Sequence, residues 1–363
     1  MSTSSNENSN GRRLLVAFLI VVSIASLGIA AGAYSYARRK ASLPEEHVLE
    51  VYGLNRPVKN RLADRYQDAD GDLVADAPAD EAQWLDPDKI KFNYLATKQD
   101  HYAEVWTPFI AYLSEKIGRP VEYQPYDLPE DQLLAIHKGE TQIVGVNSGS
   151  VPIAVNSCGF IPLCSLGSEA GVATYTMQII VPRDSSITDV KQINGHMLTL
   201  TDSTSNSGWK APMMVLWRDF QLQPVRNFDV VYSGSHVDSI RGIAEGKYQV
   251  AAVASDEVAL AIARDEIGKD DFRVLYESEP FCNNVFGVPH NLSPGLAESI
   301  RSAFLAYPWE GTKLKEEFAT IGADRFQPVD YKKNFKLIRE IDDAMGRPHE
   351  LSELSRKRGG PRG

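Results

Sequence analysis

The sequence predicts an α/β protein of two lobes that follow an N-terminal apolar segment. Strand-like and helix-like segments alternate from Lys91 onward, which is typical of a mostly parallel sheet flanked by helices. The chain has 363 residues, more than one compact core needs. Its content of 43% apolar and 24% charged residues is that of a folded soluble protein. An uncharged apolar run precedes the alternating part.

The apolar run from Leu14 to Ala33 is long enough, at about 20 residues, to cross a bilayer, and it follows Arg12 and Arg13. Residues 31–33 have the small-residue spacing of a signal-peptidase site, but the run exceeds the roughly 7–15 apolar residues of a signal peptide. We therefore expect a membrane anchor over residues 14–37 after a cytoplasmic tail of residues 1–13, with cleavage and secretion as the alternative. In both cases the rest of the chain lies on the extracytoplasmic, periplasmic side.

Residues 38–87 form an acidic stretch rich in Pro and Ala, which lacks a sustained apolar period and is expected to be a tether. Carboxylates alternate around Gly71 within it, and such hard oxygens are the ligands that calcium prefers. The stretch resembles the acidic calcium loops of thrombospondin type 3 and dockerin repeats. A structural calcium site and a solvated acidic linker both remain open. The candidate metal ligands are Asp68, Asp70, Asp72 and Asp76.

Composition excludes some classes of function. The formal net charge is −10, and the chain lacks the basic stripes that a nucleic-acid partner requires. A small anionic ligand stays possible, because a few backbone N–H groups act locally whatever the net charge. Three cysteines are too few for a disulfide scaffold. A bridge between Cys158 and Cys164 and two free buried cysteines are both open.

The order of segments divides the alternating part into two lobes joined by two crossings. The first lobe is expected over residues 88–180 and 280–345, with the second lobe, residues 181–279, inserted between. A charged tail follows over residues 346–363. The expected strands are 92–95, 121–123, 143–146, 174–181, 198–200, 229–231, 250–253, 273–276 and 285–288, and the expected helices are 103–117, 131–138, 151–156, 211–220, 235–244, 257–265, 294–306 and 314–321.

A cluster of short polar residues stands between the strand at 198–200 and the helix at 211–220. Ser203, Thr204 and Ser205 are followed by Asn206, Ser207 and Gly208 at the start of this helix. The first turn of a helix leaves N–H groups unpaired and carries partial positive charge, so an oxyanion placed there receives several hydrogen bonds. One serine would suffice as a helix cap. The whole cluster therefore predicts a binding site for an oxyanion.

Three segments give the chain a resemblance to a known family. The helix start Asp202–Pro212, then Ser235–Ile240, then Gly246–Ala252, are similar to the phosphate, phosphite and phosphonate binding proteins of ABC importers. The resemblance covers about residues 90–345 and implies the two-lobed clamp of type II periplasmic binding proteins. It also implies a small oxyanion as ligand, an ABC permease as partner and no cofactor.

The resemblance implies binding roles residue by residue. In the family the helix start commonly has the sequence Ser-Thr-Ser-Gly, and here Ser205, Ser207 and Gly208 match while Asn206 replaces the threonine. A second departure lies at Asn283 and Asn284, where the family often has an aspartate that contacts the ligand's amine or acidic proton. Asparagine at these positions weakens the case for an aminoalkylphosphonate.

Further side chains at strand ends are candidates for the same site. His236 has no second histidine at metal-ligand spacing, so a structural or ligand-contacting role is favoured over a metal. Asp238 and Asp256 could accept a hydrogen bond from a protonated phosphate oxygen or from a ligand ammonium. Ser148 is either a helix cap or part of the first lobe's wall, and a tyrosine at a strand end is either core or a cover for the anion. The candidate ligand-binding residues are Ser205, Asn206, Ser207, Gly208, His236, Asp238, Asp256, Ser148, Tyr94, Tyr175 and Asn284.

The function predicted from these features is that of the solute-binding component of an ABC importer for phosphonate, phosphite or phosphate. A ligand-sensing ectodomain that signals through a membrane partner is the main alternative. An enzyme acting on a small phosphorylated compound is less favoured, because the chain has none of the G-x-S-x-G, P-loop, G-x-G-x-x-G or zinc-ligand patterns. We therefore predict that the chain is not an enzyme.

Overall fold

The computed structural model describes residues 44–54, 57, 59, 61–94, 99–126 and 128–345, with isolated positions between residues 18 and 36. The expected tails over residues 1–13 and 346–363 and most of the expected anchor over residues 14–37 lie outside the described residues. Within the described part, no helix is both long and apolar enough to span a bilayer. The chain divides into two compact units, Met1–Leu49 and Glu50–Gly363, and the features below belong to the second.

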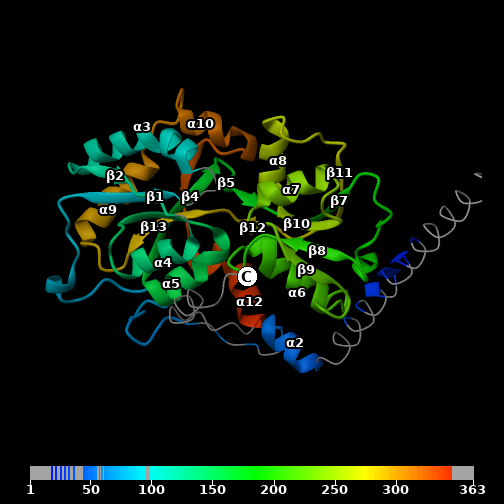
Figure 1. Ribbon diagram of the computed structural model, residues 1–363. Coiled ribbons are helices and arrows are strands. Elements are labelled where there is room, and N and C mark those ends of the chain that lie inside the picture. The colour runs from blue at the N-terminus through cyan, green and yellow to red at the C-terminus, as the bar shows by residue number, and fades with distance from the viewer. Residues whose placement is uncertain are drawn as a thin grey trace, which may run out of the picture. The chain divides into compact units, whose positions relative to one another are not determined.

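The first lobe is built on a seven-stranded sheet (Figure 1). Its strand order is β14-β4-β13-β3-β1-β2, with β5 paired to β4. Strands β2, β1 and β3 are parallel, whereas β13, β4 and β14 run antiparallel to their neighbours. Its strands are β1 (Ile90–Tyr94), β2 (Val121–Tyr123), β3 (Ile143–Val146), β4 (Phe160–Ser168), β5 (Gly171–Val172), β13 (Val285–Pro289) and β14 (Arg325–Pro328).

The second lobe has a five-stranded sheet in the order β11-β7-β10-β8-β9. Its strands are β7 (Met177–Pro182), β8 (Met197–Leu200), β9 (Asp229–Tyr232), β10 (Val250–Ala254) and β11 (Phe272–Glu277). Strands β10, β8 and β9 are parallel, and β7 runs antiparallel to both β10 and β11. Both sheets are therefore mixed, and the expectation of mostly parallel sheets was wrong. Strands β4, β13 and β14 pair antiparallel in the first sheet, and β7 pairs antiparallel with both of its neighbours in the second.

The crossing between the lobes differs from the expectation. The single strand expected over residues 174–181 is two strands, β6 (Thr174–Tyr175) and β7, which are separated at Thr176. Strand β6 pairs with β12 (Phe281–Cys282) in a small antiparallel ribbon, while β7 belongs to the second sheet. The lobe boundary thus lies near Thr176 rather than at residue 180, and the two crossing segments are hydrogen-bonded to each other.

Helices flank the two sheets (Figure 1). The polar run before the second-lobe helix forms a short π-helix, η4, because its serine cap starts helical bonding five residues before the expected position. The helices are α2 (Glu45–Val51), α3 (Gln99–Ile117), α4 (Pro129–His137), α5 (Val151–Cys158), α6 (Ala211–Arg218), α7 (His236–Ala244), α8 (Ser255–Ala263), α9 (Pro294–Leu305), α10 (Lys313–Phe318), α11 (Tyr331–Asn334) and α12 (Lys336–Ala344), with short turns η1 (Glu81–Gln83), η2 (Ser148–Ser150), η3 (Val190–Ile193), η4 (Asn206–Lys210) and η5 (Ala319–Ile321).

Aromatic rings fill the core of the first lobe. Phe92 of β1, Trp106 and Phe109 of α3 and Phe286 of β13 are fully buried and lie with ring centroids 5.2–6.3 Å apart in the pairs they form. Their burial removes large apolar surfaces from water and joins the sheet to α3.

The segment expected to be a tether contains helix α2, and its residues 61–87 are bonded to the first lobe. Ala63 N–H donates to the carbonyl of Asn156 at 2.9 Å, and Leu85 N–H donates to that of Asn291 at 2.6 Å. Arg119 forms an ion pair with Asp86 at 2.8 Å. Two of these contacts are backbone hydrogen bonds and one is an ion pair, and none depends on an apolar stripe, so residue periodicity did not indicate them.

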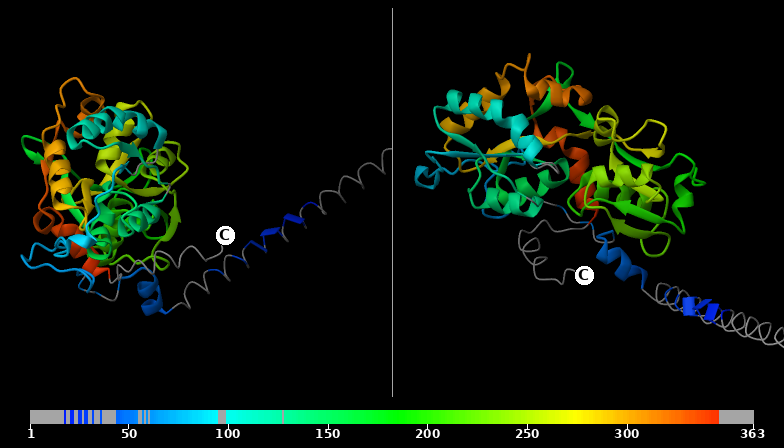
Figure 2. Two further views of the ribbon diagram at one scale, coloured as in Figure 1. Left: turned by 90° about the vertical axis from the view of Figure 1, so that its left-hand side faces the viewer. Right: turned by 45° about the horizontal axis from the view of Figure 1, so that its top comes forward.

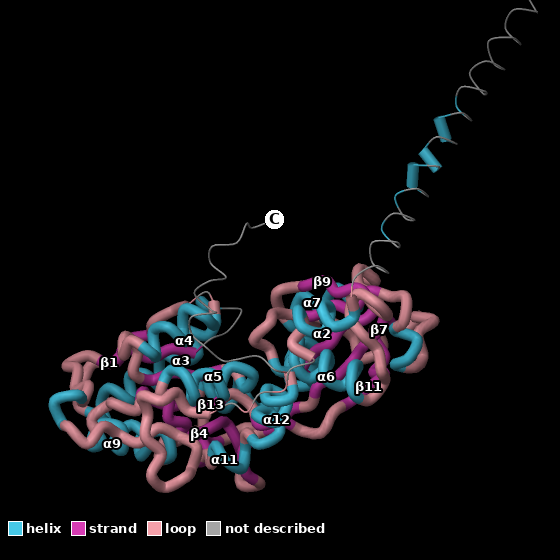
Figure 3. The backbone as a smooth tube through the Cα atoms, turned by 90° about the horizontal axis from the view of Figure 1, so that it is seen from below, coloured by secondary structure: helices cyan, strands magenta, loops and turns pink. Residues whose placement is uncertain are grey.

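Helix α12 was not expected from the sequence, and it lies where the two lobes meet. It contacts α5 of the first lobe as well as α6 and η4 of the second. Figure 2 shows this red helix between the cyan-to-orange lobe and the green lobe, and Figure 3 shows it from below between α5 and α6. One face of α12 is buried through Ile338, Ile341 and Asp342. The carboxylate on that face is unusual and is considered below.

Candidate functional site

The polar cluster expected to bind an oxyanion forms the start of a helix at the end of β8. Ser205 is the cap of η4, and its Oγ accepts a hydrogen bond from the Gly208 N–H at 3.0 Å. All five residues of η4 are buried. Pro212 stands in the first turn of α6, where its missing N–H costs nothing. The polar cluster is therefore a buried, serine-capped helix start that closely follows β8 in the chain.

Gly208 allows this turn to lie against β8. A Cβ placed on Gly208 would stand 2.0 Å from Thr201 Oγ1 and 2.7 Å from Thr201 Cγ2. Thr201 is 2% exposed and its N–H donates to the Gly208 carbonyl at 3.0 Å. Glycine is needed here for close approach rather than for an unusual backbone angle.

His236 faces the two serines of the helix start. Its Nε2 lies 3.3 Å from Ser205 Oγ and 3.4 Å from Ser207 Oγ. The Ala254 N–H donates to its Nδ1 at 3.2 Å, so Nδ1 carries no proton and the neutral ring has its proton on Nε2. Burial lowers the pKa of His236 to about 4, although Asp202 nearby acts in the opposite direction. At neutral pH the ring is thus an uncharged donor directed at the serines.

This burial predicts a pH dependence of stability. The folded-state pKa of about 4 lies below the ordinary value of 6.5, so as the pH falls through this window the unfolded chain takes up a proton that the folded protein excludes. The free energy of unfolding should therefore decrease, by about 3 kcal/mol at most from this group. Urea unfolding of wild type and His236→Gln between pH 7 and pH 4 measures it. Equal pH profiles of the two proteins would contradict the prediction.

Three of the predicted residues from different parts of the chain bond to one another. Ser148 Oγ of the first lobe lies 2.6 Å from the hydroxyl of Tyr175, which is on the crossing strand β6. Asn206 Nδ2 of the second lobe donates to the same hydroxyl at 3.1 Å. Burial is the main reason that the pKa of Tyr175 is raised to about 12. Among the described residues, the buried Asn206 Oδ1 has no hydrogen-bond partner.

The turn η2 brings the first lobe into direct contact with the helix start. A Cβ on Gly149 would stand 2.3 Å from the Thr204 carbonyl oxygen and 2.5 Å from Asn206 N. Lys210 Nζ donates to the Gly149 carbonyl at 2.6 Å. The two lobes therefore meet at the predicted anion site without space for a side chain at Gly149.

A second group of predicted residues surrounds a carboxylate. Asp256, at the start of α8, accepts a hydrogen bond from Asn283 Nδ2 at 2.8 Å, and burial raises the pKa of this carboxyl group. Asn284 Nδ2 donates to the Tyr94 hydroxyl at 3.2 Å. The pKa of Tyr94 is also raised, mainly by burial. The amide of Asn283 thus donates to a carboxylate of the second lobe, and the amide of Asn284 donates to a hydroxyl of the first lobe.

Asp238 is not brought together with the other candidates. Its side chain is more than half exposed and accepts a hydrogen bond from Ser235 Oγ at 2.7 Å, and its backbone N–H donates back to that hydroxyl as part of the α7 cap.

Sequence reasoning missed Lys210, although a signal was present: it is the only charged residue between Ser203 and Trp217. A lone charge in an otherwise uncharged helix start requires a buried partner.

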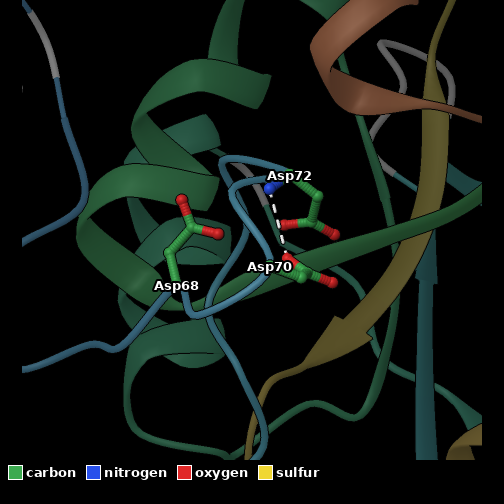
Figure 4. A group of neighbouring side chains, drawn as sticks. All are labelled: Asp68, Asp70 and Asp72. Carbon is green, nitrogen blue, oxygen red and sulfur yellow. Dashed lines mark hydrogen bonds between the residues drawn. The ribbon is translucent and has the colours of Figure 1, made fainter.

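The acidic loop brings three of its four candidate ligands together (Figure 4). Asp68, Asp70 and Asp72 each offer a carboxylate oxygen within 4.8 Å of the others. Asp76 instead accepts from the Ala69 N–H at 2.8 Å and closes the loop. Burial and the neighbouring carboxylates raise the pKa of Asp72. The buried Asp68 Oδ1 lacks a partner among the described residues.

All three cysteines are free and buried, so the alternative of a bridge between Cys158 and Cys164 was wrong. Burial raises the pKa of the Cys158 and Cys282 thiols to about 12 in each case. They are small buried side chains that remain protonated.

The two lobes, the paired crossings and the polar site where the lobes meet define the class of two-lobed binding proteins. A family model described as ABC transporter, phosphonate, periplasmic substrate-binding protein matches residues 94–335. The chain belongs to this family, which confirms the resemblance found in the sequence and its implied two-lobed fold. Members are extracytoplasmic solute-binding components of transporters, and this confirms the prediction that the chain is not an enzyme.

Solved structures share the fold at low identity. A binding protein component of an ABC phosphonate transporter from Pseudomonas aeruginosa is similar at 18% identity and a TM-score of 0.61, over 75% of this chain and 96% of that one. PhnD1 from Prochlorococcus marinus in complex with methylphosphonate is similar at 16% identity and a TM-score of 0.60, over 70% and 97%. XAC2383 from Xanthomonas citri, bound to chloride ion, is similar at 18% identity and 0.60, over 71% and 99%.

Proposed function

We propose that the protein binds a small phosphorus oxyanion, namely phosphonate, phosphite or phosphate, at the start of η4 and delivers it to an ABC permease. The observation that carries the proposal is the capped, buried helix start with two serine hydroxyls facing the uncharged His236. Helix N–H groups, hydroxyls and an imidazole N–H are all donors, and oxyanions are acceptors. The structure of a relative holding methylphosphonate supports this ligand class.

Binding would be coupled to closure of the lobes. Ser148 and Tyr175 would cover the anion from the side opposite the helix start, replacing the bonds that they now make with each other and with Asn206. A ligand that contacts both lobes favours the arrangement in which they meet. The closed form would then be the form that docks on the permease.

Asp256 would rank the ligands by their protonation. Burial raises the pKa of this carboxyl group, which means that the charged carboxylate is disfavoured where it stands. A ligand that donates a hydrogen bond to it from an acidic O–H or an ammonium group would offset this cost. A fully ionised oxyanion has nothing to donate there. We therefore favour ligands that carry an acidic proton or an amine close to the anionic group.

Calorimetry of the extracytoplasmic part against phosphate, phosphite, methylphosphonate and 2-aminoethylphosphonate tests the proposal. We expect one or more of them to bind, and the double variant Ser205→Ala/Ser207→Ala to bind it roughly 100-fold more weakly, because two charge-assisted hydrogen bonds are lost. Ser299→Ala, on the exposed face of α9, is the matched control. If wild type binds none of the four anions, the oxyanion proposal is ruled out, while the assignment of the fold is unaffected.

We further propose that the acidic loop binds one calcium ion through Asp68, Asp70 and Asp72. The partnerless Asp68 Oδ1 and the three convergent carboxylates support the site. Calcium at 1 mM should raise the midpoint of thermal unfolding by several degrees, because an ion that binds only the folded state stabilises it. Asp70→Asn should reduce this shift, while Asp64→Asn, an exposed carboxylate outside the loop, should not. An equal midpoint with calcium and with chelator would contradict the site.

A further inference from the structure

Lys210 ends the anion-binding helix start with a buried ion pair. Its Nζ lies 2.7 Å from Asp342 Oδ1 on α12, and the two side chains are only 6% and 2% exposed. Burying two charges is costly unless each is paired and hydrogen-bonded. This buried pair joins two segments that are far apart in the sequence. Apolar side chains of similar volume would fill the same space with a smaller desolvation penalty, so filling space does not explain the pair.

The same ammonium reaches across to the first lobe. It donates to the Gly149 carbonyl at 2.6 Å, and Gly149 is the residue whose backbone meets Thr204 and Asn206 at the site. An ammonium has three donors, and here one goes to the carboxylate and one crosses between the lobes. Separation of the lobes would remove the carbonyl and leave this buried charge with fewer hydrogen bonds. The cost of that loss favours the closed arrangement.

We infer that Lys210 and Asp342 are a positioning pair that holds the turn η2 against the anion-binding helix start, so that α12 takes part in closing the binding site. Asp342 pairs with the ammonium and fixes its direction, and Lys210 supplies the bond between the lobes. The carboxylate also neutralises the lysine, so the bound anion is held by neutral donors rather than by this cation. The effect on affinity rests on the proposed oxyanion function, whereas the effect on contact between the lobes does not.

A double variant separates positioning from simple stability. Removal of one partner would leave a buried unpaired charge and could unfold the protein. Lys210→Met/Asp342→Leu replaces both charges by apolar side chains of similar size, and such replacements are often neutral for folding. Lys89→Met/Glu122→Leu, which removes an ion pair of 2.8 Å that is more than half exposed within the first lobe, is the matched control.

Two measurements decide the matter in the variant and its control. Amide hydrogen exchange in the ligand-free protein is followed for residues 147–151 and 205–209, and the dissociation constant is measured by calorimetry for whichever of the four oxyanions wild type binds. We expect faster exchange in both segments and binding about tenfold weaker, the loss for one charged hydrogen bond, at an unchanged unfolding midpoint. The control variant should match wild type in both.

The positioning role would be overturned if these amides exchanged as slowly in the double variant as in wild type. It would also be overturned if wild type bound an anion and the double variant bound it with equal affinity. A wild type that binds none of the four anions would contradict the proposed function instead. In that case the exchange comparison alone still decides whether the pair joins the lobes.

Discussion

Alanine at position 149 is expected to weaken oxyanion binding about 100-fold or more while leaving the separate lobes folded. The added methyl group would stand 2.3–3.0 Å from three backbone atoms of residues 204–206, which cannot move aside as a flexible side chain can. These nearest atoms all belong to the opposite lobe. The steric conflict therefore appears only when the lobes close. It makes the closed arrangement less favourable and so weakens the binding of the ligand.

Calorimetry measures the lost affinity, and small-angle scattering with and without ligand shows whether the Gly149→Ala protein still contracts. Gly295→Ala is the control, because a Cβ there has no heavy atom within 4 Å. Wild-type affinity for Gly149→Ala would show that this contact between the lobes is not part of the bound state.

Gly208→Ala is expected to reduce both stability and binding. Its Cβ would collide with the side chain of Thr201, which is buried and has no room to turn away. Overpacking of this kind costs about 1–3 kcal/mol of unfolding free energy. The helix start would be pushed away from the end of β8, so its N–H groups would no longer converge and affinity should fall by at least tenfold.

Urea unfolding and calorimetry of the same variant test both effects. Thr201→Gly removes all three atoms that the new Cβ would meet, so the double variant Thr201→Gly/Gly208→Ala should recover much of the affinity lost in Gly208→Ala. A Gly208→Ala protein as stable and as tightly binding as wild type would show that close packing against β8 is unnecessary.

The two departures from the family's sequence acquire a structural meaning. Asn206, which the sequence resemblance matches to a threonine, donates through its amide to the Tyr175 hydroxyl and so bonds the helix start to the crossing strand. Asn283 stands near where an acid is usual, and it donates to Asp256 instead. The amide of Asn283 therefore orients a carboxylate that stands in the first turn of α8.

Much of the site could be predicted from sequence because its causes are local. A serine before a helix accepts from the N–H three residues later wherever that helix lies, so Ser205 could be predicted as the cap that the structure shows, and its role in ligand binding stays a prediction. Alternation of strands and helices likewise indicated two α/β lobes, and three short segments indicated the family. These features depend on neighbours within a few positions of the chain.

Only the tertiary structure decided which distant segments meet. The strand β7 joined the second sheet, the residues before β1 packed on the first lobe, and α12 placed Asp342 beside Lys210. These three contacts cannot be recognised from neighbouring residues in the sequence. A backbone hydrogen bond or an ion pair requires that its two partners lie close in space, but it does not fix how far apart they lie along the chain. In the sequence Lys210 is a single charge among uncharged residues, and its burial became known only from the structure. Folding alone determined that the partner is Asp342 and that the same ammonium joins the two lobes.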